Sequence, residues 1–213
     1  GHIGSHLIRH RFNHDDLYVV DNLSTQRYCS LFNVGKKYTF IDEDFSKITD
    51  ELLYQMDIVI HLAAITNAQE SFDNKNAIEE INITKTKELI DRIKYYNTQS
   101  EFDNKKIHFI FPSSTSVYGS AVKEVFEDND DFINPQSPYA ESKIEIERYI
   151  KNNLNDYTIL RLGTIFGNSV GMRFHTAINK FCYQAAFEKS LTVWKQNYTQ
   201  VRPYLGINDA QTA

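Results

Sequence analysis

The sequence predicts an α/β protein built on a doubly wound parallel sheet, and three observations support this prediction. Short apolar segments, each long enough for one strand, alternate along the chain with segments that have helical periodicity. One of them, from Asp57 to Ala64, is apolar without polar alternation, as expected for a parallel strand that helices cover on both faces. The chain opens on a glycine turn, Gly1 and Gly4, that runs directly into a helical segment, which is typical of a βαβ unit.

The composition indicates a globular protein and argues against several classes of partner. The 213 residues are 41% hydrophobic and 24% charged, enough to bury a sizeable core in one large domain or one domain plus a fragment. The net charge is -5 and no basic cluster follows a helix or loop, so nucleic acid is not an expected partner. The longest apolar run is far shorter than the ~20 residues of a membrane helix, so no membrane partner is expected.

The two cysteines favour a reducing compartment. Cys29 and Cys182 lie far apart in the sequence and fit neither a disulfide framework nor a metal-binding spacing. We therefore expect a cytoplasmic protein without a metal site.

The first half of the chain predicts alternating elements. The opening helix runs through about Phe12, and Leu17 to Val20 is a short apolar strand that ends on Asp21. A strand that is covered on both faces, residues 57–64, is the clearest element here because its apolar run is continuous. The other expected elements are a strand at 38–41, a helical segment at 46–54 and a long helix at about 77–95.

The second half continues this alternation. Residues 107–111 form the next buried strand, and we expect Pro112 to end it because proline cannot donate to a sheet ladder. Ser137 and Pro138 start a helix, since the serine oxygen can cap free N–H groups and proline has no N–H to lose at the first helical position. The remaining expected elements are that helix to about Asn153, a strand at 157–162, a helical segment at 174–187 and a short strand at 191–194.

Tyr139 and Lys143 stand out in the first turns of this helix. They are four residues apart and therefore lie on one face. A phenol has a reference pKa near ~10, so a tyrosine base at neutral pH needs about three units of depression, roughly 4 kcal/mol. A fixed ammonium beside the phenol supplies such stabilisation. A tyrosine and a lysine four residues apart are common by chance, often as two solvated residues on a helix face. Other parts of the chain must therefore support a catalytic role for this pair.

Three further signals occur in a fixed order before this pair. The glycine turn comes first. Asp21 follows Gly4 by 17 residues and Gly1 by 20, about the distance at which an acid ends the second strand of a nucleotide-binding βαβ unit and accepts hydrogen bonds from the adenosine ribose. The third signal is the serine-rich end of a strand, Ser113-Ser114-Thr115-Ser116-Val117-Tyr118-Gly119.

Together these signals resemble the extended short-chain dehydrogenase/reductase family, in its NAD-dependent nucleotide-sugar epimerase/dehydratase branch typified by UDP-glucose 4-epimerase. The resemblance covers essentially the whole chain and implies a Rossmann-like fold with NAD as cofactor. Gly1 and Gly4 match the second and third glycines of the Gly-x-x-Gly-x-x-Gly fingerprint, and Asn82 matches a mainly structural asparagine. The resemblance further implies an NAD-binding domain at 1–167, which carries the catalytic residues, and a partial substrate lobe at 168–213.

The resemblance also implies residue roles. Tyr139 would be the acid/base, Lys143 would lower the phenol pKa and bond the nicotinamide ribose, and Ser114 would bond the reacting oxygen. The pyrophosphate would rest on the helix N-terminus after Gly1 and Gly4. The other candidates for the cofactor are Asp21, Asn22, Asp44, Phe45, Leu62, Ala63 and Ala64, and those for the substrate are Ser114, Thr164 and Arg202.

Simpler roles stay open for several of these residues. Asp21 or Ser114 could cap a local turn, and Asp44 could belong to a solvated acidic turn. Arg202 could form a surface ion pair. His61 is more readily a packed strand residue than a catalytic one.

The sequence departs from the family pattern at three places. The first fingerprint glycine and its strand are absent, so we expect the natural protein to extend upstream and the 213 residues alone to be insoluble or unable to bind NAD. The usual C-terminal lobe is incomplete. Thr164 stands where the family usually has asparagine, which leaves the sugar and the nucleotide open.

The leading functional prediction is an isomerase, an NAD-dependent nucleotide-sugar epimerase that acts at C4 through a transient 4-keto sugar. Dehydratases and decarboxylases of the family usually carry acidic residues where this chain has Thr115-Ser116-Val117, so they are alternatives, as is a reductase. A non-catalytic NAD-binding sensor or scaffold is an alternative of another class. The expected partner is a nucleotide sugar, and a homodimer is left open.

Overall fold

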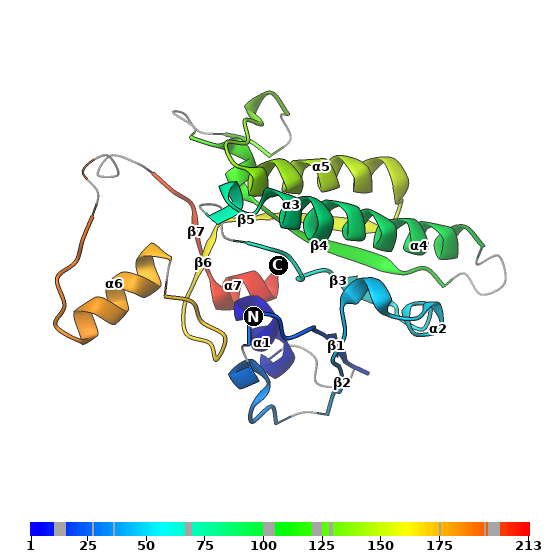
Figure 1. The fold of residues 1–213 in the computed structure, drawn as a ribbon, viewed down its shortest axis with the longest axis horizontal. Helices are drawn as coiled ribbons and strands as arrows, with labels where there is room; N and C mark the ends of the chain where they lie inside the picture. The colour runs from blue at the N-terminus through cyan, green and yellow to red at the C-terminus, as the bar shows by residue number, and fades with distance from the viewer. Residues whose placement is uncertain are drawn as a thin grey trace. The chain divides into compact units, whose positions relative to one another are not determined.

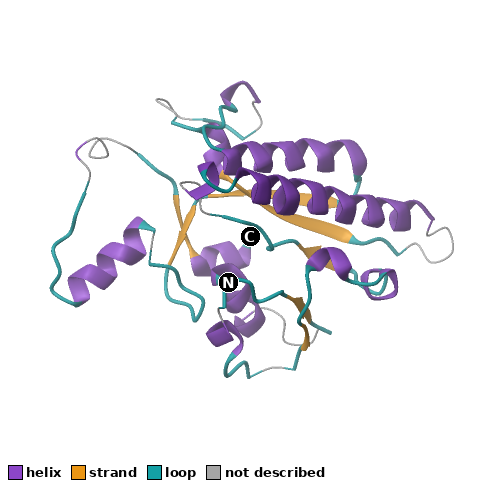
Figure 2. Ribbon diagram, in the orientation of Figure 1, coloured by secondary structure: helices purple, strands orange, loops and turns teal. Residues whose placement is uncertain are grey.

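The structure is a computed structural model (Figures 1 and 2), and two compact units are described in it separately: Glu43–Arg161, and Gly1–Asp42 together with Leu162–Ala213. The predicted boundary between residues 167 and 168 stays a prediction. The described residues are 1–10, 16–26, 28–35, 37–66, 70–99, 105–120, 125–127, 130–174, 176–193, 195 and 201–213.

The unit Glu43–Arg161 is built on a three-stranded sheet in the order β3-β4-β5. β3 and β4 pair in parallel, with Ile58 opposite His108. The helices α4 and α5 lie side by side along the sheet (Figure 1). The bounds of these elements are Ile58–Ile60 for β3, His108–Ser114 for β4, Tyr157–Leu162 for β5, Lys85–Gln99 for α4 and Pro138–Asn153 for α5.

The core of this unit lies between the sheet and the two helices. Alternate residues of β4 are buried, so Phe109, Phe111 and Ser113 lie on its inner face. Helix α5 contributes Ile146 and Ile150, which are fully buried in the same cluster as the two phenylalanines. Each such apolar side chain stabilises the fold by about 1.5–3 kcal/mol. This packing fixes α5, and the residues of its first turns, against β4.

Two strand ends differ from the prediction. β3 stops at Ile60 instead of continuing to Ala64, because His61 makes the last bond to β4, from its N–H to the Ile110 carbonyl, and the chain then leaves the ladder. The prediction that Pro112 ends β4 was wrong. Pro112 lies beyond the part of β4 that pairs with β3, so no bond on that side requires an N–H from it.

The helix predicted at 46–54 is two short pieces. A 3-10 turn, Phe45–Lys47, is capped by Asp44, and α2, Asp50–Leu53, is capped by Thr49. Between them Ile48 is extended, with φ -58° and ψ 141°, which interrupts the helix.

The long helix predicted at about 77–95 is continuous but not uniform. Asn82 lies in its middle, in a rare π-helical turn, and such turns frequently occur at functional sites. The three consecutive segments are α3 at Lys75–Ile78, the π-helical turn at Glu79–Thr84 and α4 at Lys85–Gln99.

The other unit contains two small parallel sheets. β1 pairs with β2, and β6 pairs with β7. The described strands of the chain therefore form three parallel sheets rather than one. The bounds are His2–His10 for α1, Tyr18–Val20 for β1, Thr39–Ile41 for β2, Thr164–Phe166 for β6, Ala177–Ala186 for α6, Tyr204–Gly206 for β7 and Ile207–Thr212 for α7.

Some predicted ends in this unit changed. The opening helix ends at His10, and residues 11 and 12 lie outside the described part. The short strand predicted at 191–194 was wrong for residues 191–193, which are not in a strand, and Trp194 lies outside the described residues. Among the described residues, this unit also has a 3-10 turn at Tyr28–Leu31, and the unit Glu43–Arg161 has further ones at Glu70–Phe72, Thr115–Tyr118 and Asp130–Phe132.

Within the described part of the chain, no helix has the length and apolar character needed to cross a membrane. The same residues contain no group of three or more histidine, cysteine or acidic side chains placed to hold a metal ion.

Candidate functional site

Helix α5 positions the predicted catalytic pair, and its start follows the predicted capping chemistry. The Ser137 hydroxyl oxygen accepts a hydrogen bond from the Ala140 N–H at 3.2 Å, and Pro138 occupies the first turn. This confirms the helix start predicted from the sequence. Tyr139 is therefore in the first turn, and Lys143 lies one turn further along the same face.

Lys143 is buried beside the end of β4. Its Nζ donates to the Pro112 carbonyl at 2.8 Å and lies 4.4 Å from the centre of the Phe111 ring and 5.8 Å from that of Tyr139. Burial lowers the pKa of Lys143 to about 8, and the negative charge of Glu147 opposes this shift. The ammonium is thus held close to the phenol ring, in a place where small changes in its surroundings alter its charge near neutral pH.

Ser114 and Ser113 have different roles at the end of β4. The Ser114 oxygen accepts from the Ser116 N–H at 3.1 Å and caps the 3-10 turn that follows. This is the local cap considered from the sequence, but it uses only an acceptor site of the hydroxyl, so it is compatible with donation by the O–H to a substrate. Ser113 is buried and donates to the Glu147 carboxylate, which makes it the weaker candidate for substrate contact.

A buried ion pair next to these residues was not predicted. Glu147 of α5 pairs with Arg161 of β5, with 2.6 Å between Arg161 Nη2 and Glu147 Oε2. The same guanidinium donates to the Tyr118 hydroxyl at 2.8 Å. One sequence signal could have found it: Glu147 follows Lys143 by four residues, and so continues the face that begins at Tyr139.

His61 is a packed, neutral residue, as the sequence favoured. It is buried, its Nε2 lies 3.1 Å from the Thr86 hydroxyl oxygen, and its ring meets the Phe45 ring edge-on at 4.7 Å. Burial, reinforced by the positive charge of Lys143, lowers the pKa of His61 to about 3. It therefore does not titrate at physiological pH.

The segment after His61 contains the candidates Leu62, Ala63 and Ala64, which are partly buried. Asn82 holds the end of this segment: its amide oxygen accepts from the Ile65 N–H at 2.9 Å, and its Nδ2 donates to the Ile65 carbonyl at 3.0 Å. The family resemblance gave Asn82 a mainly structural role, and this two-bond contact is consistent with it.

Asp44 is held by its neighbours. Its Oδ1 accepts from the Ser46 N–H at 3.0 Å and from the Ser46 hydroxyl at 2.7 Å, while Oδ2 pairs with Lys85 at 3.1 Å. Burial alone would raise the pKa of Asp44, but the bonds from Ser46 and the Lys85 charge outweigh it, and the pKa is lowered. The carboxylate caps the turn that carries Phe45, so the contact of these two residues with adenine stays a prediction.

The glycine turn and the predicted ribose acid lie in the other unit. A Cβ built on Gly1 meets no atom within 4 Å, whereas one built on Gly171 would lie 2.5 Å from the Gly1 carbonyl oxygen. Asp21 directly follows β1, and its Oδ1 accepts from the Leu23 N–H at 2.8 Å. Asn22 makes a similar local bond, from the Ser24 N–H at 3.1 Å. Asp21 therefore does cap a local turn, and its contact with ribose stays a prediction.

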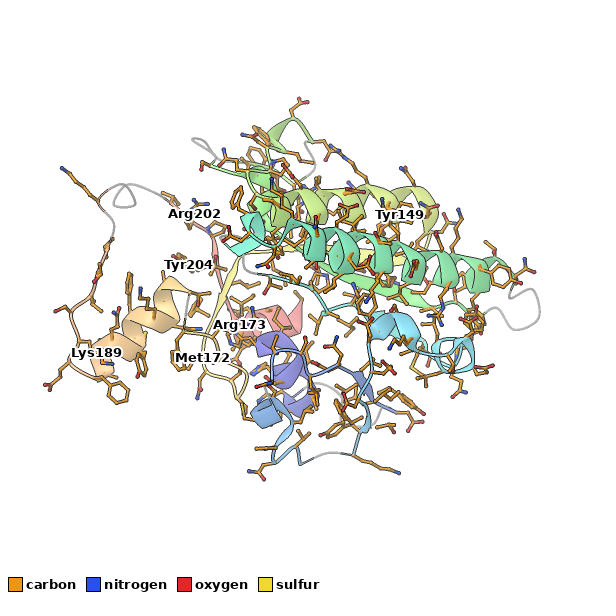
Figure 3. All side chains as sticks on the ribbon, in the orientation of Figure 1. Tyr149, Met172, Arg173, Lys189, Arg202 and Tyr204 are labelled. Carbon is orange, nitrogen blue, oxygen red and sulfur yellow. The ribbon has the colours of Figure 1, made fainter. Side chains whose placement is uncertain are left out.

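The substrate candidates Thr164 and Arg202 also lie in this unit. The Thr164 N–H donates to the Pro203 carbonyl at 2.9 Å, which brings the start of β6 next to the residue that follows Arg202. Figure 3 shows Arg202 and Tyr204 following one another along the chain into β7. Their contact with substrate stays a prediction.

A model of the family described as "NAD dependent epimerase/dehydratase family" matches residues 1–213. The chain belongs to this family. The match confirms the family that the glycine turn, the serine-rich strand end and the Tyr139–Lys143 pair predicted, and the family is NAD dependent.

Individual relatives within the family differ in reaction. A dTDP-D-glucose 4,6-dehydratase of Dictyostelium discoideum is 29% identical over 238 residues, which cover 100% of this chain and 52% of the relative. A putative UDP-glucose 4-epimerase of Methanocaldococcus jannaschii is 33% identical over 175 residues, which cover 78% of this chain and 54% of the relative. The chain thus spans about half the length of these relatives.

Solved structures confirm the predicted α/β fold class. The crystal structure of UDP-glucuronic acid 4-epimerase from Bacillus cereus, in complex with UDP-glucuronic acid and NAD, is similar with a TM-score of 0.82 and 28% identity. The match covers 99% of this chain and 68% of that one.

Proposed function

We propose that the protein is an NAD-dependent nucleotide-sugar epimerase that acts at C4 of the sugar. The observation that carries the proposal is the buried Lys143 ammonium beside the Tyr139 ring, at the end of the strand that carries Ser114. A mere pair of solvated helix residues would not place the lysine in the interior. The Bacillus cereus 4-epimerase, which is similar over nearly the whole chain, supports the reaction class.

The chain's own residues fit NAD. In the unit that begins at Gly1, the backbone N–H groups at the start of α1 would hold a pyrophosphate, and Asp21 would bond the adenosine ribose. In the unit Glu43–Arg161, Lys143 would bond the nicotinamide ribose, because an ammonium has three N–H donors and Pro112 takes one. The chemistry that bound NAD supplies is reversible hydride acceptance.

The protein would supply the acid and the base. Oxidation of the sugar C4 hydroxyl requires a group that takes the O–H proton, and the Tyr139 phenolate would take it and later return it. Lys143 would stabilise the phenolate through its charge. Ser114 would donate its O–H to the C4 oxygen and hold that oxygen in place as charge develops. The 4-keto sugar would then rotate within the site and be reduced on its other face.

A 4,6-dehydratase is the second candidate, because the Dictyostelium discoideum relative bears that name. Elimination of water needs an additional acid and base near C5 and C6. The turn after Ser114 offers Thr115, Ser116 and Val117, none of which is acidic, and Val117 is fully buried. This composition favours epimerisation.

The test is to incubate the full-length protein with NAD and a panel of UDP-, GDP-, CDP- and dTDP-sugars, and to identify the products by NMR. We expect the C4 epimer of at least one sugar, with no net change in cofactor absorbance. A 4-keto-6-deoxy product would establish the dehydratase, and a stoichiometric change in absorbance would establish a reductase. Bound NAD with every sugar unchanged would favour the sensor or scaffold.

A pair of variants assigns the acid/base. Tyr139→Phe keeps the ring but removes the exchangeable proton, so turnover should fall by at least about 100-fold while NAD still binds. Tyr149→Phe is the matched control, because Tyr149 lies on the same helix (Figure 3) and its hydroxyl donates to the exposed Asp91 side chain. Near-normal turnover of Tyr139→Phe with an identified substrate would show that the assignment is wrong.

A further inference from the structure

The Glu147–Arg161 ion pair is a deeply buried polar cluster next to the proposed catalytic residues. The side chain of Glu147 is 1% exposed and that of Arg161 is 9% exposed. Arg161 Nε lies 3.1 Å from each carboxylate oxygen, and Nη2 lies 2.6 Å from Oε2. The carboxylate also accepts from the Ser113 hydroxyl. Both oxygens therefore have partners, supplied by β4 and β5.

Such a pair is weak evidence for stability, because removing two charges from water offsets most of their attraction. It is strong evidence for defined geometry, since a planar guanidinium binds a carboxylate only in a few fixed orientations. The role of the ion pair therefore depends on which residues it holds in a fixed orientation.

One helical placement and two hydrogen bonds connect the pair to the proposed catalytic residues. Glu147 lies one helical turn after Lys143 on the same face of α5. Ser113 stands between Pro112, whose carbonyl accepts from Lys143, and Ser114. The Tyr118 hydroxyl, at the far end of the turn that Ser114 caps, accepts from Arg161 Nη1 at 2.8 Å.

We propose that Glu147, held by Arg161, is a positioning residue that keeps Ser114 in register with Tyr139 and Lys143. The proposal rests on the proposed function, which gives those three residues their roles. Glu147 belongs to helix α5 and binds the end of β4 through the Ser113 hydroxyl. Arg161 binds the following turn through the Tyr118 hydroxyl. A displacement of about 1 Å at a reacting group can lower a rate by roughly 100-fold.

Glu147 also acts on the charge of Lys143. The groups that face Lys143 are His61 after β3, Tyr139 and Glu147 on α5, and Arg161 of β5 through Glu147. His61 is neutral, so Glu147 is the anion that favours the ammonium. Replacing it by a neutral residue removes the buried carboxylate from Arg161, which retains the exposed Asp130 at 3.8 Å. Both changes disfavour charge on Lys143.

The experiment compares Glu147→Gln with Glu145→Gln in the full-length protein. Glu145 is on the same helix and forms an ion pair with Lys87, but it is 46% exposed, so it is a matched control. For Glu147→Gln we expect kcat to fall by at least about tenfold with the NAD dissociation constant within about twofold of wild type. The pH profile of kcat should move, and backbone amides of residues 114–119 should exchange faster with deuterium. Glu145→Gln should match wild type in all four measurements.

A double variant separates loss of positioning from loss of the fold. Glu147→Met with Arg161→Met removes both charges, so no unpaired charge remains buried, and such replacements are often tolerated. A folded double variant with wild-type kcat and wild-type exchange at 114–119 would overturn the proposal. So would a Glu147→Gln protein whose only change is a lower melting temperature.

The design separates this proposal from the proposed function. If wild type converts no nucleotide sugar, the proposed function fails, whereas amide exchange at 114–119 and the titration of the Lys143 ¹³Cε resonance still test the positioning role. If wild type is active and Glu147→Gln matches it in every measurement, the positioning role fails and the proposed function stands.

Discussion

Replacing Lys143 by methionine should stabilise the protein at neutral pH while it abolishes turnover. Lys143 is buried, and this lowers its pKa from 10.5 to about 8. At about 1.4 kcal/mol per pH unit, carrying the charged lysine into the folded state costs about 3 kcal/mol at pH 7. Methionine removes that cost but also loses the bond to the Pro112 carbonyl, worth about 1–2 kcal/mol. Lys143→Met should therefore be about 1–2 kcal/mol more stable than wild type at pH 7.

The advantage must reverse at high pH. The folded-state pKa of Lys143 is below the unfolded value, so between about pH 8 and 10.5 the unfolded chain holds a proton that the folded protein has released. The free energy of unfolding of wild type therefore rises with pH across this window, whereas Lys143→Met lacks this contribution. The two stability curves should cross within it.

Urea denaturation of both proteins at pH 7, 8, 9 and 10 measures this difference. Lys151→Met, an exposed position at the end of the same helix, is the matched control and should stay within about 0.5 kcal/mol of wild type. A Lys143→Met protein that is less stable than wild type at pH 7, or whose stability runs parallel to wild type over the whole range, would refute the reasoning.

Three further predictions concern cofactor choice and local structure. NAD should bind more tightly than NADP, because the Asp21 carboxylate would repel a 2'-phosphate; equal or tighter NADP binding in a titration would contradict this. Asn82→Ala removes both bonds to the Ile65 backbone and should lower the free energy of unfolding by about 1–3 kcal/mol, and an unchanged urea midpoint would show that the contact is dispensable. Gly119→Ala places a Cβ 2.2 Å from the Asn134 carbonyl oxygen at φ +61° and should lower the free energy of unfolding by at least about 2 kcal/mol. Gly35→Ala, where a Cβ meets no atom within 4 Å, should leave it unchanged, and equal urea midpoints for the two variants would argue against the geometry at Gly119.

The elements predicted best are those whose ends depend on neighbouring residues. Helix α5 has the predicted bounds because Ser137 and Pro138 act within one turn of the helix start. β5 also has its predicted bounds, Tyr157–Leu162, because its apolar run is short and well delimited. The spacing of Tyr139 and Lys143 is of the same kind, since helical periodicity alone puts them on one face.

The elements predicted less well depend on partners far away in the sequence. Pro112 was expected to end β4, but how far β3 runs alongside decides which N–H groups the ladder needs. The π-helical turn around Asn82 accompanies a contact with Ile65, 17 residues earlier, which no periodicity in the helix itself indicates.

For the candidate site, the sequence by itself determined the residue types, their order and, through capping chemistry, the helix start at Ser137, while the family followed from the resemblance of these motifs. Only the tertiary structure decided that Lys143 is buried against Pro112, and that Glu147 meets Arg161 and Ser113. Burial and ion pairing depend on which strands lie next to α5, and β4 and the helix are brought together by apolar packing between residues far apart in the chain. The charge of the lysine, and with it the chemistry that the tyrosine can perform, is therefore a property of the folded protein.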